Sequence, residues 1–181
     1  LGLGTCWVGG IFARSGFSRR IETKKRETIP AIVTTGYMAD GGGAGDPIRR
    51  MAGSNQRLPW VTLFFDTRWG IPLAPEAAGA YAEAQEMLRL GPSASNKQPW
   101  RVVREGDRWH FYLHRTPGYP AAGLGKLVGI ADLQRADMGI AMCHFELTAA
   151  ELGLAGQWQI DDPGLELPGD LTAYTATWAG G

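Results

Sequence analysis

The sequence has 181 residues, with 18 basic and 18 acidic side chains and a formal net charge of zero. Hydrophobic residues make up 44% and charged residues 20%, as in an ordinary globular protein. The zero net charge argues against a protein built mainly to bind nucleic acid or an anionic membrane, and no apolar run is long enough to span a bilayer. Cys6 and Cys143 are too few and too far apart for a disulfide framework or a metal site, so we expect reduced thiols in a cytoplasmic protein.

The N-terminal part is poor in regular patterns. The opening LGLG is typical of the last turn of a helix, so we expect a fragment that lacks an N-terminal piece. Residues 30–37 are rich in β-branched side chains and predict a strand, and the glycines of 40–46 predict a flexible loop. Residues 47–74 show no period and are expected to be irregular. Their anchors would be the aromatic residues Trp60, Phe64, Phe65 and Trp69.

The C-terminal part has clear periods. Residues 75–90 predict a helix that begins at a proline and ends at Gly91. Residues 100–104 and 108–114 predict a hairpin around Glu-Gly-Asp. Residues 133–152 predict a long helix, and 174–178 a closing strand.

The second strand of the hairpin alternates between two kinds of side chain, which predicts one apolar face and one wet face. The apolar set is Trp109, Phe111 and Leu113, and the wet set is His110, Tyr112 and His114.

An internal repeat links the two ends of the chain. Residues 1–7 (LGLGTCW) match residues 152–158 (LGLAGQW) as LGLxxxW, and each copy is followed by a predicted strand. A chance match is the alternative, because the segments are short and rich in Leu and Gly. The repeat predicts the tail of one α+β unit over residues 1–74, followed by a second unit over 75–181 that packs with it in one globule.

Common catalytic patterns are missing. The glycines of residues 2–10 are too widely spaced for a dinucleotide fingerprint, and Gly125-Lys126 lacks the Ser or Thr of a phosphate-binding loop. We therefore predict no catalytic side chain and no metal site, and an enzyme of this sequence would need a cofactor to supply its chemistry.

Two segments carry candidate binding groups. Residues 92–100 (PSASNKQPW) hold small hydrogen-bonding side chains between two prolines, which suits the edge of a planar polar ligand. Residues 5–10 (TCWVGG) offer paired glycines and an indole wall. The alternatives are a capped helix–strand connection for the first segment and a tight turn for the second.

PSASNKQPW resembles the PSxxNxQPW signature of the flavin-dependent nitroreductase family, and LGLGTCWVGG resembles that family's GLGTCWxGG segment. The two motifs stand here in reversed order, as in the branch that fuses two nitroreductase-like units into a monomeric pseudo-dimer. The resemblance implies an α+β fold in which helices flank an antiparallel-rich sheet. One complete unit and the tail of a second would be present.

The resemblance also implies FMN bound between the two units. Gly9 and Gly10 would direct backbone N–H groups toward the flavin, and Trp7 and Val8 would line the ring. From the other unit, four residues would contact the ring and the ribityl chain: Pro92, Ser93, Ala94 and Asn96. Arg49 and Arg50 are the candidates for the phosphate. The family's N-terminal R-x-S-x-R phosphate anchor is absent, because residues 14–19 have the wrong spacing and suit a solvated loop.

The function implied is hydride relay from NAD(P)H through FMN to an electron-poor acceptor such as a nitroaromatic or a quinone. Two alternatives remain. The chain could be a non-catalytic flavin-binding module. Residues 13–27, with a net charge of +4, could instead bind nucleic acid, although a solvated loop is the expected reading.

Overall fold

The computed structural model describes residues 2–9, 12, 14–24, 27, 29–37, 51, 53–119 and 131–181. Strands β3 (Phe64–Asp66), β4 (Trp100–Glu105), β5 (Arg108–His114), β7 (Thr172–Gly180) and β6 (Gly156–Gln159) form one sheet in that order. Only β3 and β4 run parallel, and the other neighbours are antiparallel. The predicted α+β class with an antiparallel-rich sheet is therefore confirmed.

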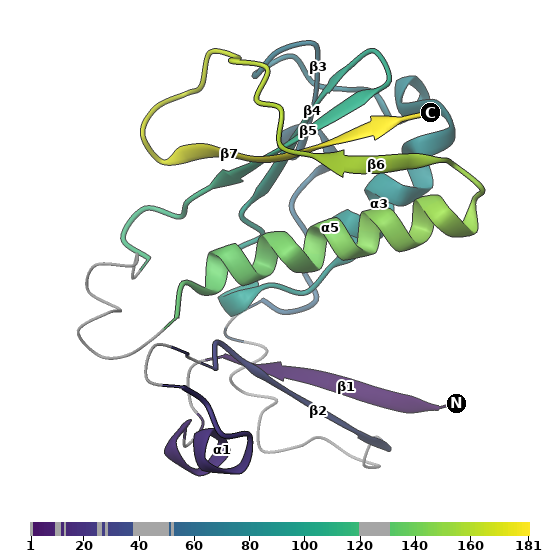
Figure 1. Cartoon of the computed structure of the whole chain (residues 1–181). Helices are drawn as coiled ribbons and strands as arrows, with labels where there is room; N and C mark the ends of the chain where they lie inside the picture. Colours follow the sequence, from purple (N-terminus) through teal and green to yellow (C-terminus); the bar gives the residue numbers. More distant parts are fainter. Residues whose placement is uncertain are drawn as a thin grey trace.

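One face of the sheet is covered by α3 (Ala82–Leu90) and α5 (Leu133–Glu151), as Figure 1 shows. Phe111 and Trp109 of β5 pack here on Phe145 of α5, with ring centroids 5.3 and 6.1 Å apart. Trp100 is fully buried in the same layer. This layer is the main hydrophobic core and fixes α5 against the sheet.

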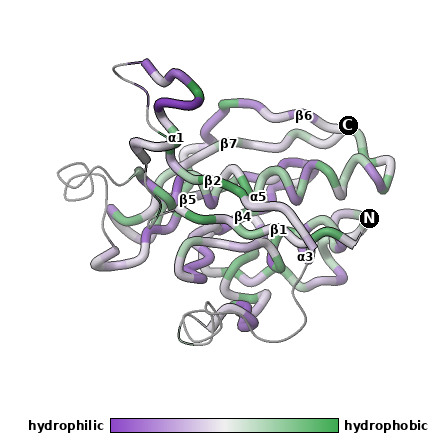
Figure 2. The backbone as a smooth tube through the Cα atoms, turned by 90° about the horizontal axis from the view of Figure 1, so that it is seen from below, coloured by the Kyte–Doolittle hydropathy of each residue, from purple (hydrophilic) through white to green (hydrophobic). Residues whose placement is uncertain are grey.

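The second strand pair lies on the other side of α5. β1 (Leu3–Val8) pairs antiparallel with β2 (Ile32–Tyr37), and α1 (Arg14–Arg20) follows β1. Figure 1 places this pair below α5, away from the large sheet, and the view from below in Figure 2 shows it overlying α5. The helix α5 thus lies between the two sheets.

The two copies of the LGLxxxW repeat share two local features. Gly2 and Gly153 both have a left-handed backbone, with φ of 67° and 71°, and Gly153 follows the end of α5. The Trp of each copy lies in a strand that pairs antiparallel with the next strand in the sequence, so Trp7 lies opposite Val33 and Trp158 opposite Trp178. The expected strands at 30–37 and 174–178 are confirmed, with bounds of 32–37 and 172–180.

The wet face predicted for β5 is wrong. His110 is 1% exposed and Tyr112 is fully buried. A second, smaller core covers this face, in which Tyr112 packs with Phe65 and Val103 under the partly buried Leu165 and Leu167. The alternation of polar and apolar residues marks which side chains share a face, but the segment that covers a face comes from elsewhere in the chain.

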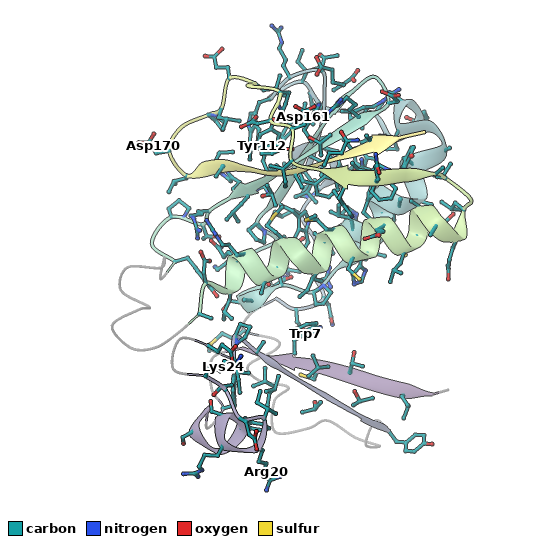
Figure 3. The ribbon with its side chains drawn as sticks, viewed as in Figure 1. Trp7, Arg20, Lys24, Tyr112, Asp161 and Asp170 are labelled. Atoms are coloured by element: carbon teal, nitrogen blue, oxygen red, sulfur yellow. The ribbon has the colours of Figure 1, made fainter. Side chains whose placement is uncertain are left out.

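Polar side chains on this face bond to each other. His110 Nδ1 lies 2.8 Å from Thr177 Oγ1, which in turn lies 2.7 Å from the Tyr174 hydroxyl. Figure 3 shows Tyr112 and Asp161 on this side of the sheet, away from α5. The face therefore combines the small apolar core with a group of hydrogen-bonded polar side chains.

Four further expectations need correction. The helix predicted over 75–90 is broken: a 3-10 helix covers Pro75–Tyr81, Gly79 has φ of 57°, and α3 begins at Ala82. Residues 14–19 lie in the short helix α1 rather than in a loop, although the helix is largely exposed. Leu3 and Gly4 lie in β1 rather than in a helix end.

The fourth correction concerns residues 47–74. They contain the strand β3 and a 3-10 turn at Trp60–Thr62, where only irregular structure is expected. The expected aromatic anchoring of this segment is confirmed, because Phe64 and Phe65 are buried and Trp60 packs on the main core. The hairpin over 100–114 and the long helix from residue 133 are also confirmed. The predicted loop at 40–46 lies outside the described residues.

Candidate cofactor site

The PSASNKQPW segment forms a tight loop between α3 and β4. Ser95, Asn96 and Gln98 have left-handed backbones, with φ of 50°, 53° and 48°. Residues other than glycine seldom adopt this conformation, and in folded proteins it concentrates at functional sites and ligand clamps. Such a loop keeps its shape only if its surroundings hold it.

Hydrogen bonds inside the chain supply that support. Gln98 N donates to Ser93 Oγ at 2.8 Å, and Leu58 N donates to Gln98 Oε1 at 2.8 Å. Asn96 Nδ2 donates to the carbonyl oxygens of Gly53 and Gln56 at 2.6 and 3.0 Å. The polar side chains that the sequence marks for a ligand are thus largely used to build the loop, and Asn96 ties it to residues 53–58.

One further bond joins the loop to α5. Asp137 Oδ1 accepts a hydrogen bond from Ala94 N at 2.9 Å, and Asp137 is only 3% exposed. The pKa of Asp137 is raised to about 7, and burial is the largest cause. The hydrogen bond from Ala94 N lowers the pKa in part, and the nearby Asp132 adds to the rise. Asp137 Oδ2 has no hydrogen-bond partner among the described residues.

Sequence reasoning missed Asp137. A signal was present, because an aspartate occurs inside a helix between apolar neighbours, at a position that the 3.6-residue period assigns to the buried face. A charged residue there needs a partner or an altered pKa. That position was the available clue.

The TCWVGG segment lies in β1 up to Val8, and Gly9 contacts the same helix. Trp7 is 51% exposed, and Val8 and Gly9 are partly buried. In Figure 3, Trp7 lies between α5 and the β1–β2 pair, while Arg20 and Lys24 lie on the far side of that pair. A Cβ built on Gly9 would lie 2.9 Å from Leu133 Cδ2, so the glycine permits a close approach of backbone to helix.

The two motif segments therefore meet on one helix. Leu133 and Asp137 are four residues apart on α5, one turn and about 6 Å along the axis, and so share one face. Leu133 contacts Gly9 and Asp137 holds Ala94. The structure thus brings together the predicted residues Gly9 and Ala94, which are 85 positions apart in the sequence.

Three predicted residues, Gly10, Arg49 and Arg50, lie outside the described residues. Tyr119 adds a neighbour that the sequence did not suggest. Its hydroxyl bonds to the Ser95 side chain, and burial raises its pKa. The loop thereby has Tyr119 as a neighbour in addition to α5.

The described residues also bear on metal binding and on membrane insertion. Their His, Cys, Asp and Glu side chains form no group of three that could hold a metal ion. Within the same residues, none of the helices combines the length and the apolarity needed to cross a membrane. Cys6 and Cys143 are both free and exposed.

Comparisons with known proteins identify the family and a similar fold. The family model described as "Putative TM nitroreductase" matches residues 1–149. The fold is similar to the crystal structure of a putative nitroreductase from Thermotoga maritima, with a TM-score of 0.53 and 20% identity over 98% of this chain. The match covers 55% of the Thermotoga chain, so this chain spans about half the length of that relative. A search of curated proteins finds no match to this sequence.

Proposed function

Because this chain belongs to the nitroreductase family whose model matches residues 1–149, we propose that it acts in an FMN-dependent oxidoreduction. NAD(P)H would be the electron donor, and an electron-poor compound such as a nitroaromatic or a quinone the acceptor. Bound FMN would supply the hydride chemistry by accepting electrons from the donor and passing them on. The protein's own residues would bind, orient and shield the reacting molecules.

The observation that carries the proposal is the contact of both motif segments with adjacent turns of α5. A planar ligand between them would find an exposed indole, a close backbone approach and a buried carboxylate oxygen that has no partner among the described residues. Flat faces with a few convergent polar groups are what cofactor sites provide. The residues present therefore fit a flavin.

The assignment of single residues follows from this arrangement. Gly9 and Gly10 would donate backbone N–H groups to the ring system, where they favour negative charge on the reduced cofactor. Trp7 and Val8 would exclude water from one side. Pro92, which is exposed, and Ser93 and Ala94, which are partly buried, would contact the ring and ribityl chain.

Asn96 and the two arginines have different proposed roles. The amide of Asn96 is bonded to residues 53 and 56, so its main contribution would be the shape of the loop. Arg49 and Arg50 would approach the phosphate, where each charge-assisted contact contributes about 1.5–3 kcal/mol.

We also propose that residues 1–74 and 75–181 derive from two nitroreductase-like units that close around one flavin. The repeated left-handed glycine, strand and antiparallel partner in β1–β2 and β6–β7 support this organisation. Two related units in one chain would act as a monomeric pseudo-dimer.

The test is a titration of the purified chain with FMN, followed by flavin fluorescence. We expect the fluorescence to be quenched on binding, and the complex to oxidise NAD(P)H when a nitroaromatic is added. Trp7→Ala should weaken binding, whereas Tyr37→Ala, which removes an 84% exposed aromatic of the same strand pair, should not. Absence of FMN binding would refute the proposal. Binding without NAD(P)H oxidation would support the alternative, a non-catalytic flavin-binding module.

A further inference from the structure

One stripe of α5 contacts both halves of the candidate site. Leu133, Asp137 and Ile140 have the i, i+4, i+7 spacing of a single helix face. Leu133 faces Gly9, Asp137 accepts from Ala94 N, and Ile140 Cγ2 would lie 4.0 Å from a Cβ on Gly91. The loop from Gly91 to Ala94 therefore follows α5 toward its N-terminus, where Gly9 lies.

Asp137 is the polar member of this stripe. The carboxylate is 3% exposed, and a buried carboxylate is costly unless it has a structural task or a partner. Oδ1 has such a task, because it accepts the Ala94 N–H at 2.9 Å, while Oδ2 has no partner in the described part of the chain.

The loop needs an attachment at this point. Ser95 and Asn96 follow Ala94 directly, and both have left-handed backbones. Asn96 is also held by residues 53–57 and by Gln98, and Ser95 by Tyr119, and none of these partners belongs to α5. Gly9 contacts Leu133 on α5. Among the described contacts, the bond to Asp137 is the polar contact that fixes Ala94 relative to this same helix.

We infer that Asp137 is a positioning residue: it holds Ala94 against α5 and so sets the separation between the 92–99 loop and Gly9. This inference rests on the proposed flavin site for its functional meaning, since that separation would be the width of the crevice. Its structural content, the bond between Asp137 and Ala94, can be measured without any flavin.

The groups that act on Asp137 come from three parts of the described chain: the N-terminus of α5, Tyr119 after β5, and the 92–99 loop. Asp132, at the N-terminus of the same helix, is itself paired with Arg115 at 2.6 Å. Tyr119, after β5, is close enough to feel the charge of Asp137, and it bonds to Ser95. The loop contributes the Ala94 N–H, and Gly9, which follows β1, contacts Leu133 one helical turn away.

The first test is the NMR signal of the Ala94 amide in the 15N-labelled chain without ligand. A carboxylate that accepts this N–H should shift the amide proton as the pH is raised through the titration of Asp137. In Asp137→Asn the side-chain oxygen still accepts the bond, but nothing titrates, so the shift should disappear. An Ala94 amide that responds to pH identically in both proteins would overturn the inference.

The second test compares Asp137→Leu with a matched control. Gln134→Leu also removes a buried polar side chain from α5, but Gln134 bonds to Thr116 rather than to the 92–99 loop. We expect Asp137→Leu to lose the protection of amides 94–96 from hydrogen exchange and to bind FMN about tenfold more weakly, while Gln134→Leu keeps both. Equal FMN affinity and equal protection in the two variants would refute the positioning role.

The two proposals fail separately. If the wild-type chain does not bind FMN, the proposed function is wrong, and the Ala94 amide still decides whether Asp137 holds the loop. If FMN binds but Asp137→Leu behaves like Gln134→Leu, the function stands and the positioning role is wrong. If Asp137→Leu does not fold, the comparison of wild type with Asp137→Asn decides.

Discussion

Leu133 packs so closely on Gly9 that a Cβ at the glycine would lie 2.9 Å from Leu133 Cδ2. This contact joins β1 to the first turn of α5. It also explains why a glycine stands at this position even though its φ does not require one.

We predict that Gly9→Ala destabilises the protein by about 1 kcal/mol, because Leu133 must move to admit the new methyl group. Leu133→Ala should remove the clash, so the double variant Gly9→Ala/Leu133→Ala should lose less than the sum of the single variants. Urea unfolding of the four proteins measures this coupling. Strict additivity of the two changes would show that the contact does not form.

Asn96 gives a second prediction, because it combines a left-handed φ of 53° with two side-chain bonds to backbone carbonyls. Asn96→Ala removes both hydrogen bonds and puts alanine in a left-handed conformation that it adopts less readily than asparagine. This variant should therefore lower the free energy of unfolding by about 2–3 kcal/mol. Asn96→Gly also removes the bonds, but glycine adopts the left-handed conformation without strain. Its free energy of unfolding should therefore be about 1 kcal/mol higher than that of Asn96→Ala. Chemical denaturation of the two variants decides, and a glycine variant no more stable than the alanine variant would contradict the argument.

The buried carboxyl group of Asp137 should make the stability of the folded protein depend on pH. Its pKa is raised to about 7 in the folded protein, so the folded chain keeps a proton that the unfolded chain releases near pH 4. The stabilisation by this proton is complete below about pH 4 and is lost as the pH rises toward 7. Between pH 5 and 8, wild type should therefore lose about 1–3 kcal/mol relative to Asp137→Asn.

The control for this comparison is Asp107→Asn, which changes an exposed turn residue of the β4–β5 hairpin. Its stability should follow that of wild type across the same pH range. A constant difference between wild type and Asp137→Asn at pH 5 and pH 8 would refute the prediction.

The buried imidazole of His110 should give the stability of the folded protein the opposite dependence on pH. Burial is the largest influence on His110 and lowers its pKa, although the carboxylate of Glu105, 3.5 Å from Nε2, raises it in part. The unfolded chain then takes up a proton below pH 6.5 that the folded chain excludes, so stability is lost as the pH falls through this range. In His110→Asn this loss should be smaller, with a part remaining from His114, whose pKa burial also lowers, whereas His144→Asn on α5 should keep the full loss. Thermal unfolding at pH 7 and pH 5.5 tests the pair.

The sequence predicted the strongly periodic elements correctly. Local patterns of apolar residues predict the hairpin, the long helix and the closing strand. Because a period of 2 or 3.6 residues is a property of a short segment, it can be recognised without knowing what packs against that segment. The predictions were wrong where the structure of a segment depends on another segment that is distant in the sequence. β3 is a strand of three residues because β4 lies beside it, and Tyr112 is buried because residues 165–174 cover it.

The same division holds for the site. By itself, the sequence determined the two motifs, the family resemblance and the repeat that relates β1 to β6. Only the tertiary structure decided that Gly9 and Ala94 meet on one helix, that Asn96 bonds to the backbone of residues 53 and 56 and that Asp137 is buried. The physical reason is that a motif records which groups are available. Their partners are fixed by packing between segments that lie far apart along the chain.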